Sequence, residues 1–330
     1  MNTPAILLLL IFRLVRRIAL VAPVVAVLAL SNLLGGCATQ PARALSETVH
    51  PKAGQVRPFD PSRLSVALVL SGGSVRGLAH IGVLQALDEL GLVPDLIVGT
   101  SAGSLVGAGY AAGLNASQIE VAMRSLSWSA MSDWVVPQLG QPFMKGELGL
   151  VRGERLQRFA DTLVGHRRID ALPRRLAIVA TDLQSGVPVV FTEGHVGLAV
   201  HASSAIPGVF VPPIIRGRRY IDGQVSSPLP VMAARALGAD VVIAVDVTYP
   251  PDDAAITTLP DVVFQAFMIA SQRLVKTELQ GADLVIRPRI PPTKQLGIDD
   301  RERLIDSGRV ATLDLAVRLR QIWDERTTRR

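Results

Sequence analysis

The sequence predicts an α/β protein in which a mostly parallel sheet carries helices on both faces. Four continuous apolar runs have the length and composition of strands that are buried on both sides. Segments with apolar residues at helical spacing separate these runs, as in proteins built from alternating strands and helices. The chain has 330 residues, of which 49% are hydrophobic and 19% are charged, so it is able to bury a substantial core.

The N-terminal residues have the order of an export signal. Three arginines between positions 13 and 17 precede an apolar run over residues 18–34, and small residues follow up to Cys37. Pro23 and Asn32 interrupt the run, which is shorter than the roughly 20 apolar residues of a membrane-spanning helix. We therefore expect residues 1–36 to be a signal peptide, with a retained transmembrane anchor as the alternative.

Residues 34–37 resemble the lipobox of bacterial lipoproteins, in which the cysteine becomes the lipidated first residue after cleavage. Cys37 is the only cysteine of the chain, so a free thiol or an intermolecular bridge is the alternative to lipid attachment. The uncharged Ala38 that follows resembles a signal for sorting to the outer membrane. The resemblance implies an exported lipoprotein that is anchored at the membrane, facing the periplasm, by a lipid on Cys37.

The residues after this cysteine divide into a tether and a folded domain. Residues 38–63 contain four prolines and few large apolar side chains, which indicates that residues 37–63 form a lipidated, flexible tether. Residues 64–330 then form the folded domain. The net charge of +6 suits an anionic lipid surface or a nucleic acid. Export and the absence of a basic stripe interleaved with aromatic residues favour a membrane lipid over nucleic acid as partner.

The elements of the domain follow in order. Strands are expected at residues 66–70, 96–98, 176–180 and 241–245. A helix with apolar residues at helical spacing is expected over residues 78–90, where Gly91 would end it. Residues 125–153 have no clear period and contain Trp128, Trp134 and Phe143, so they read either as a lid or as a small packed cluster. Residues 301–322 are expected to form one closing helix over the sheet.

A G-x-S-x-G pattern places a serine at a strand-to-helix turn. Residues 99–103 follow the second predicted strand and precede an apolar helical segment. A sharp turn in that context exposes the hydroxyl of Ser101, and the helix that follows directs its N-terminal amides toward developing negative charge. Alone, the pattern also fits a glycine-rich turn that carries no chemistry.

Two further turns supply what a nucleophilic serine needs. Gly72 and Gly73 follow the first predicted strand, where successive backbone N–H groups can converge on one oxyanion; a phosphate-binding loop is less consistent with the spacing. Asp222 precedes a glycine after a strand-like stretch and offers a base, although an Asp-Gly pair is also an ordinary turn. The five histidines have no metal-ligand spacing, so neither a metal nor a cofactor is expected.

Taken together and in this order, the segments resemble the patatin-like phospholipase family. The resemblance covers residues 64–246 and includes the Thr181-Asp182-Leu183 and His201–Pro207 blocks. It implies a three-layer α/β/α patatin-like fold and a Ser–Asp dyad without histidine. The implied roles are a nucleophile for Ser101, a base for Asp222 and an oxyanion hole for Gly72, Gly73, Ser74 and Arg76. Ser74 stands where the family usually has a third glycine, and Arg76 is also suited to a lipid phosphate.

Three functions are consistent with these residues. The first is a serine hydrolase of the phospholipase A or lysophospholipase type that cleaves lipid acyl esters through the dyad. The second is an α/β-hydrolase esterase with a Ser–Asp–His triad, in which Asp182 with His195 or His201 completes the site. The third is a non-catalytic lipoprotein that keeps the fold to bind lipid.

Overall fold

The computed structural model describes residues 56–124, 133–134, 148–250, 256–290 and 300–328. Its main sheet has the strand order β10-β9-β1-β2-β4-β8-β7, with β5 paired to β4. The parallel strands are β10 (Leu284–Ile286), β9 (Val241–Val245), β1 (Val66–Leu70), β2 (Leu96–Thr100) and β4 (Arg175–Asp182). The antiparallel strands are β5 (Pro188–Phe191), β7 (Ile214–Ile215) and β8 (Arg218–Asp222). A separate pair joins β3 (Gly149–Val151) to β6 (Gly208–Phe210).

The central strands are apolar along their whole length because both faces of the sheet are covered. In β1, Leu68 and Leu70 belong to one hydrophobic cluster, whereas Ala67 and Val69 belong to a second cluster on the opposite face. Successive side chains of a strand point to opposite faces, so a strand buried on both sides has no polar positions. The four predicted strands are confirmed as β1, β2, β4 and β9.

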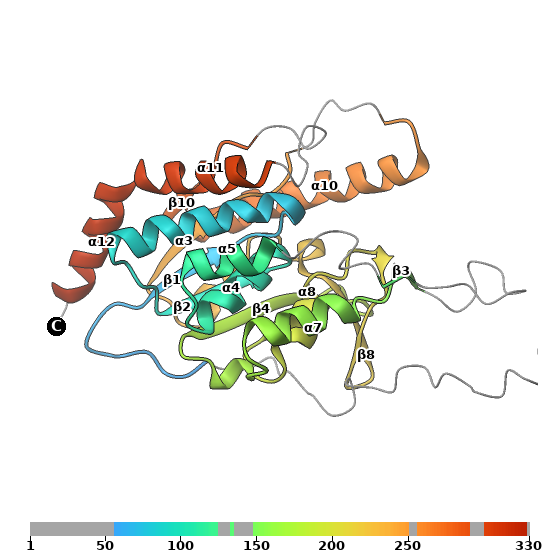
Figure 1. Cartoon of the computed structure of the whole chain (residues 1–330), viewed down its shortest axis with the longest axis horizontal. Coiled ribbons are helices and arrows are strands. Elements are labelled where there is room, and N and C mark those ends of the chain that lie inside the picture. Colours follow the sequence, from blue (N-terminus) through green and yellow to red (C-terminus); the bar gives the residue numbers. More distant parts are fainter. Residues whose placement is uncertain (1–55, 125–132, 135–147, 251–255, 291–299, 329–330) are drawn as a thin grey trace, which may run out of the picture. The chain divides into compact units, whose positions relative to one another are not determined.

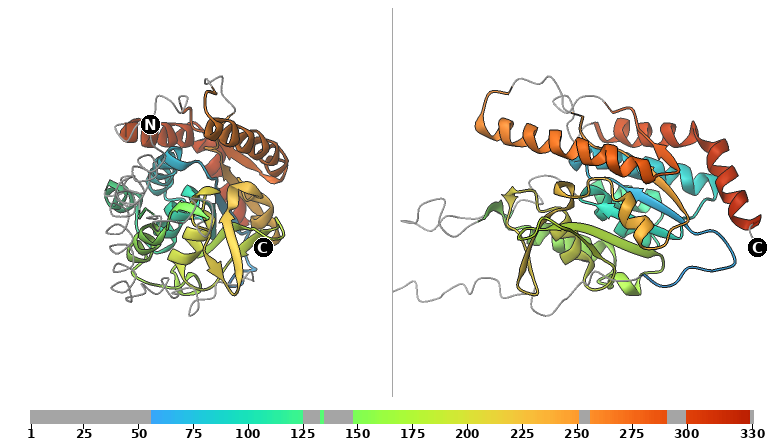
Figure 2. Two further views of the ribbon diagram at one scale, coloured as in Figure 1. Left: turned by 90° about the vertical axis from the view of Figure 1, so that its right-hand side faces the viewer. Right: turned by 180° about the vertical axis from the view of Figure 1, so that it is seen from behind.

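Helices cover both faces and complete a three-layer arrangement (Figure 1). One face carries α3 (Ala79–Leu90), α4 (Ala102–Ala111), α5 (Ala116–Arg124), α7 (Glu154–Leu163) and α8 (Val196–Ser203). The other face carries α9 (Val231–Ala236) and α10 (Leu259–Glu278), the latter nearest the viewer in the right-hand view of Figure 2. The mostly parallel sheet with helices on both faces is therefore confirmed, and α3 ends at Gly91 in the left-handed conformation, as expected.

The predicted closing helix is wrong in two respects. The segment forms two helices, α11 (Arg301–Leu313) and α12 (Ala316–Thr328), and α12 turns away from α11 at the C-terminal end (Figure 1). In addition, α11 packs on α3 rather than on the sheet. A Cβ atom on Gly82 would lie 1.7 Å from the backbone oxygen of Ile305, and one on Gly308 would lie 1.9 Å from that of Ala79. Glycine on each helix thus permits a backbone contact that no larger residue allows.

The long helix α10 was not predicted, although its start carries a local signal. The Thr258 hydroxyl accepts a hydrogen bond from the Asp261 amide, and the Asp261 carboxylate accepts one from the Thr258 amide. This reciprocal capping satisfies amides that the first turn of a helix leaves without partners. The T-x-x-D spacing is the feature that marks the beginning of α10.

Several predictions fall on the N-terminal part of the chain and on the segment between α5 and β3. The proposed signal peptide, Cys37 and most of the tether lie outside the described residues, as do Trp128 and Phe143. Among the helices within the described ranges, none is sufficiently long and apolar to cross a membrane.

Candidate active site

The register of the sheet brings Ser101 and Asp222 together from distant parts of the chain. Thr100, which precedes the serine, pairs with Val179 on β4. The next residue of β4, Ala180, pairs with Asp222 at the end of the antiparallel strand β8. Three neighbouring strands, β2, β4 and β8, therefore place the hydroxyl and the carboxyl side by side at one edge of the sheet.

Ser101 occupies a strained turn between β2 and α4. Its φ of 51° and ψ of −121° lie in a region that a side chain strongly disfavours, and such strain is concentrated at functional sites. The Ser101 amide donates a hydrogen bond of 2.8 Å to the Ser203 hydroxyl, which itself donates to the Val179 carbonyl at 2.6 Å. The turn is consequently held by α8 and β4 as well as by its own strand.

The two glycines of the G-x-S-x-G pattern are required by close backbone contacts. A Cβ atom on Gly103 would lie 2.3 Å from the backbone oxygen of Leu70, and one on Gly99 would lie 2.6 Å from that of Gly103. The first helical turn of α4 therefore lies directly against the ends of β1 and β2. This contact, rather than a need for a positive φ at either glycine, explains the small residues on both sides of the serine.

The two side chains form a direct hydrogen bond in a buried setting. Ser101 Oγ donates to Asp222 Oδ2 at 2.9 Å, and the Gln224 amide donates to Asp222 Oδ1 at 2.9 Å. The carboxyl is 1% exposed, and burial raises the pKa of Asp222 to about 7. Burial favours the neutral acid over the carboxylate, so the group is able to take up a proton near neutral pH.

The arrangement differs from a triad built on Asp182. That carboxylate accepts hydrogen bonds from Arg218, with which it forms an ion pair, and from the Ser185 amide at 2.9 Å. Within the described part of the chain, no hydrogen bond joins His195 or His201 to Ser101. The Nδ1 atom of His195 instead lies 2.8 Å from Oδ1 of Asp161.

The glycine-rich turn after β1 lies against the serine, but its residues differ in what they offer. The Gly72 amide donates a 2.9 Å hydrogen bond to the Pro228 carbonyl, so it is occupied, contrary to the expectation for an oxyanion donor. Position 72 favours glycine because a Cβ there would lie 2.7 Å from Gln224 Oε1, which is too close. No hydrogen bond within the described residues engages the amides of Gly73 or Ser74.

Ser74 adopts a φ of 48°, the conformation that a third glycine would adopt more readily. The residue therefore occupies the glycine-like position even though it carries a side chain, and its side chain is exposed. Gly73 has an extended φ, so its small size is required by packing. A Cβ there would lie 2.9 Å from both Val247 Cγ2 and the Val247 backbone oxygen.

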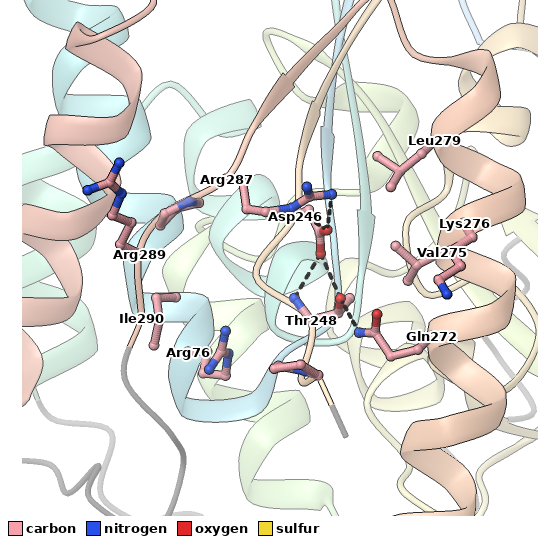
Figure 3. Close-up of a pocket in the computed structure, with 12 residues that line it drawn as sticks. Arg76, Asp246, Thr248, Gln272, Val275, Lys276, Leu279, Arg287, Arg289 and Ile290 are labelled. Carbon is pink, nitrogen blue, oxygen red and sulfur yellow. Dashed lines mark hydrogen bonds and ion pairs between the residues drawn. The ribbon is translucent and has the colours of Figure 1, made fainter. Parts of the chain in front are cut away.

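Arg76 lines a cavity that Ser101 does not line. Its Nε donates to the Val247 carbonyl at 2.9 Å, and its guanidinium lies 5.1 Å from the centre of the Tyr249 ring. The side chain is buried, which lowers the pKa of its guanidinium. Arg76 forms part of the wall of a cavity of about 730 Å³ that is also lined by residues of α10 and of the segments after β9 and β10 (Figure 3).

The sequence pattern identified the serine and the aspartate but not the residues that hold them. Ser203 supports the Ser101 amide, and Gln224 supports the Asp222 carboxyl. Ser203 lies within the His201–Pro207 block that resembles the family, but nothing local in that block indicates a contact with Ser101. Among the described residues, no group of three histidine, cysteine or acidic side chains is placed to hold a metal ion.

A serine at a strand-to-helix elbow, hydrogen-bonded to a carboxyl on an α/β sheet, is the arrangement of a serine hydrolase. The patatin-like phospholipase family model matches residues 68–235, which include Ser101 and Asp222. This protein therefore belongs to the patatin-like phospholipase family, and its α/β fold is the patatin fold.

The similar proteins include two uncharacterized NTE family proteins of Mycobacterium bovis. One is 29% identical over 75% of this chain and 46% of its own length. The other is 37% identical over 59% of this chain and 52% of its own length. Patatin-like phospholipase domain-containing protein 6 of Mus musculus is 34% identical over 56% of this chain and 13% of its own length. The chain thus spans about half or less of each of these relatives. The crystal structure of VipD from Legionella pneumophila covers 86% of this chain and 72% of VipD, with 14% identity and a TM-score of 0.47.

Proposed function

We propose that this protein is a serine hydrolase that cleaves lipid acyl esters through a dyad of Ser101 and Asp222. The observation that carries the proposal is the 2.9 Å hydrogen bond from Ser101 Oγ to a carboxyl whose pKa burial raises to about 7. A base that titrates near the working pH is best suited to accept a proton in the transition state. Membership of the patatin-like phospholipase family supports a lipid ester as the substrate.

The reaction has two halves. In the first, Ser101 Oγ attacks the ester carbonyl while its proton passes to Asp222 Oδ2, and collapse of the tetrahedral intermediate releases the alcohol, which takes that proton. In the second, Asp222 removes a proton from water, whose oxygen attacks the acyl-serine. Collapse of this second tetrahedral intermediate releases the fatty acid, and Ser101 Oγ takes back the proton from Asp222. In both halves the negative charge on the carbonyl oxygen requires donors that are already oriented. The amides of Gly73 and Ser74 are our candidates, because they follow Gly72, where a Cβ would lie 3.5 Å from Ser101 Cβ, and no hydrogen bond within the described residues engages them.

The proposal is tested by covalent labelling with a fluorophosphonate, which reacts with an activated serine. The native chain should be labelled at Ser101, and Ser101→Ala should lose both the label and the release of fatty acid from phospholipid. Ser307→Ala on α11 is a matched control, because among the described residues its hydroxyl bonds to the Leu304 carbonyl and to neither Ser101 nor Asp222. A folded native chain that resists labelling would favour the non-catalytic, lipid-binding alternative.

We also propose that the chain is a lipoprotein anchored by Cys37 at the outer membrane, on the basis of the lipobox-like residues 34–37. Lipid attachment would hold the domain beside its substrate through a flexible tether. Cys37→Ser should abolish labelling by a radioactive fatty acid and release the protein from the membrane fraction. Unchanged labelling of this variant would contradict the anchor.

A further inference from the structure

The cavity beside Arg76 lies at the same edge of the sheet as the serine, but neither Ser101 nor Asp222 lines it. Its walls come from three places: the turn after β1, the segments that follow β9 and β10, and the inner face of α10 (Figure 3). In open α/β sheets, the crevice beyond the carboxyl ends of the strands is the usual place for a ligand. The cavity therefore occupies a ligand-binding position next to the proposed catalytic pair.

The described residues that line the cavity carry an excess of positive charge. Four are cationic (Arg76, Lys276, Arg287 and Arg289), whereas Asp246 is the single carboxylate. Asp246 pairs with Arg287 at 3.0 Å and accepts hydrogen bonds from Thr248, so its charge is already compensated. Within the described part of the chain, neither Lys276 nor Arg289 has an ion pair, and both are exposed. Lys276 and Arg289 are thus cations of the wall for which the described residues supply no anionic partner.

The cavity adjoins the glycine-rich turn after β1 through Val247. A Cβ on Gly73 would touch Val247, whose backbone oxygen accepts the Arg76 hydrogen bond and whose neighbours Asp246 and Thr248 line the cavity. In the strand order, β9 is separated from β2 only by β1. Neighbouring strands lie about 4.8 Å apart, so the end of β9 lies roughly 10 Å from the serine-bearing end of β2. A glycerophospholipid whose ester lies at Ser101 covers a distance of this order with its glycerol, phosphate and headgroup taken together.

We propose that this cavity is the subsite for the phosphate-bearing headgroup of an anionic phospholipid. The inference rests on the proposed lipid hydrolysis and names its substrate class. In a glycerophospholipid the phosphate is a few bonds from the scissile ester, and guanidinium and ammonium groups are strong partners for phosphate oxygens. A cavity with uncompensated cations favours a headgroup that adds no positive charge, so phosphatidylglycerol is preferred to phosphatidylcholine.

The test compares two variants of the full chain that lose equal charge. Lys276→Gln with Arg289→Gln removes two cations from the cavity wall. Arg273→Gln with Arg320→Gln removes two exposed cations that do not line it, one of them on the same helix α10. Substrates are dihexanoyl-phosphatidylglycerol and dihexanoyl-phosphatidylcholine below their micellar concentrations, which avoids effects of a charged lipid surface. The uncharged p-nitrophenyl butyrate reports the Ser101–Asp222 pair.

The native chain is expected to show a kcat/KM for phosphatidylglycerol about ten-fold or more above that for phosphatidylcholine. The cavity variant should lose this preference, on the order of ten-fold, mainly through KM, because one charge-assisted contact is worth about one power of ten. The charge-matched variant should keep the preference. An equal loss of preference in both variants would show that only the net charge matters, which overturns the subsite.

A second arm separates a lipid headgroup from a free phosphate ester. Glycerol 3-phosphate should inhibit the hydrolysis of phosphatidylglycerol by the native chain. It should inhibit the cavity variant more weakly. Binding of glycerol 3-phosphate without any preference between the two lipids would assign the cavity to a soluble ligand and overturn the headgroup subsite. A chain that hydrolyses neither the lipids nor p-nitrophenyl butyrate would overturn the proposed function itself, a result that the uncharged ester alone identifies.

Discussion

Asp182 and Asp222 end two neighbouring strands, and the structure treats their carboxyl groups in opposite ways. Both are almost fully buried, and β4 and β8 are antiparallel partners, with Ala180 opposite Asp222 and Asp182 opposite Tyr220. Hydrogen bonds from Arg218 hold the pKa of the Asp182 carboxyl well below its usual range. Burial raises the pKa of the Asp222 carboxyl to about 7, against the hydrogen bonds from Gln224 and Ser101 that lower it.

The difference lies in how each carboxylate is compensated. Asp182 has a guanidinium partner, so its negative charge is stable and its affinity for a proton is weak. Asp222 has a backbone amide and a hydroxyl but no ion pair within the described residues, so its charge is poorly stabilised and its affinity for a proton is high. Burial alone therefore does not make a base. In the mechanism that we propose, Asp222 serves as the base because it is buried without a cation, next to the hydroxyl that gives up its proton.

The largest expected effect comes from removing the basicity of Asp222. Asp222→Asn keeps the size of the side chain, so the protein should fold while hydrolysis of p-nitrophenyl butyrate falls by about 10²–10⁴-fold. His195→Ala and His201→Ala, made singly, should retain most of the activity. An active Asp222→Asn enzyme together with an inactive, folded histidine variant would contradict the dyad. It would favour the Ser–Asp–His triad, in which a histidine is the base and Asp182 orients it.

The pH dependence should follow the carboxyl group of Asp222. Because the base must be ionised and its pKa is raised to about 7, kcat/KM should fall about ten-fold per pH unit below that value. Burial lowers the pKa of His201 to about 4, so that ring does not account for a transition near 7. The transition should persist in His195→Ala. A plateau of full activity down to pH 5 would show that the Asp222 carboxyl is not the base.

Because of the same raised pKa, Asp222 destabilises the folded protein at high pH. The folded pKa lies above the unfolded value, so the contribution of Asp222 to wild-type stability falls as the pH rises from about 4 to about 7 and is constant above that. Asp222→Asn lacks this loss and should be more stable than the wild type at pH 8, by at most about 4 kcal/mol. The difference should shrink toward pH 4. Urea unfolding at pH 5 and pH 8 measures it, and an equal difference at both values would contradict the buried, uncompensated carboxyl.

The smallest effect is expected at Asp182. Its folded pKa is depressed, so its contribution is present above the unfolded pKa and is lost as the pH falls below about 4. Asp182→Asn should lower the free energy of unfolding at pH 7 by roughly 1 kcal/mol, a modest value because the Arg218 side chain is half exposed and solvent screens the pair. Esterase activity should be retained. A large loss of turnover in a folded Asp182→Asn protein would place this residue in the catalytic site after all.

The expectations that agreed with the structure are those that depend on residues close together in the sequence. The four buried strands and the helix that ends at Gly91 depend on residues that are close in sequence, so their periodicity was sufficient to predict them. The packing of α11 on α3 rather than on the sheet depends on contacts between residues more than 200 positions apart, which no local period records. The Gly72 amide is occupied by the carbonyl of Pro228, so the pair of glycines alone did not reveal which amides remain available.

By itself, the sequence determined the α/β alternation, the turn that carries Ser101 and the presence of Asp222 before a glycine, because each is a property of a few consecutive residues. The tertiary structure decided the rest. The register across β2, β4 and β8 brings that serine to 2.9 Å from that carboxyl, and burial sets the pKa of the carboxyl. The cationic cavity arises in the same way, since Arg76 meets Val247 across 171 residues of chain. Distances and solvent exposure are properties of the packed chain, whereas composition and spacing only limit which of them are possible.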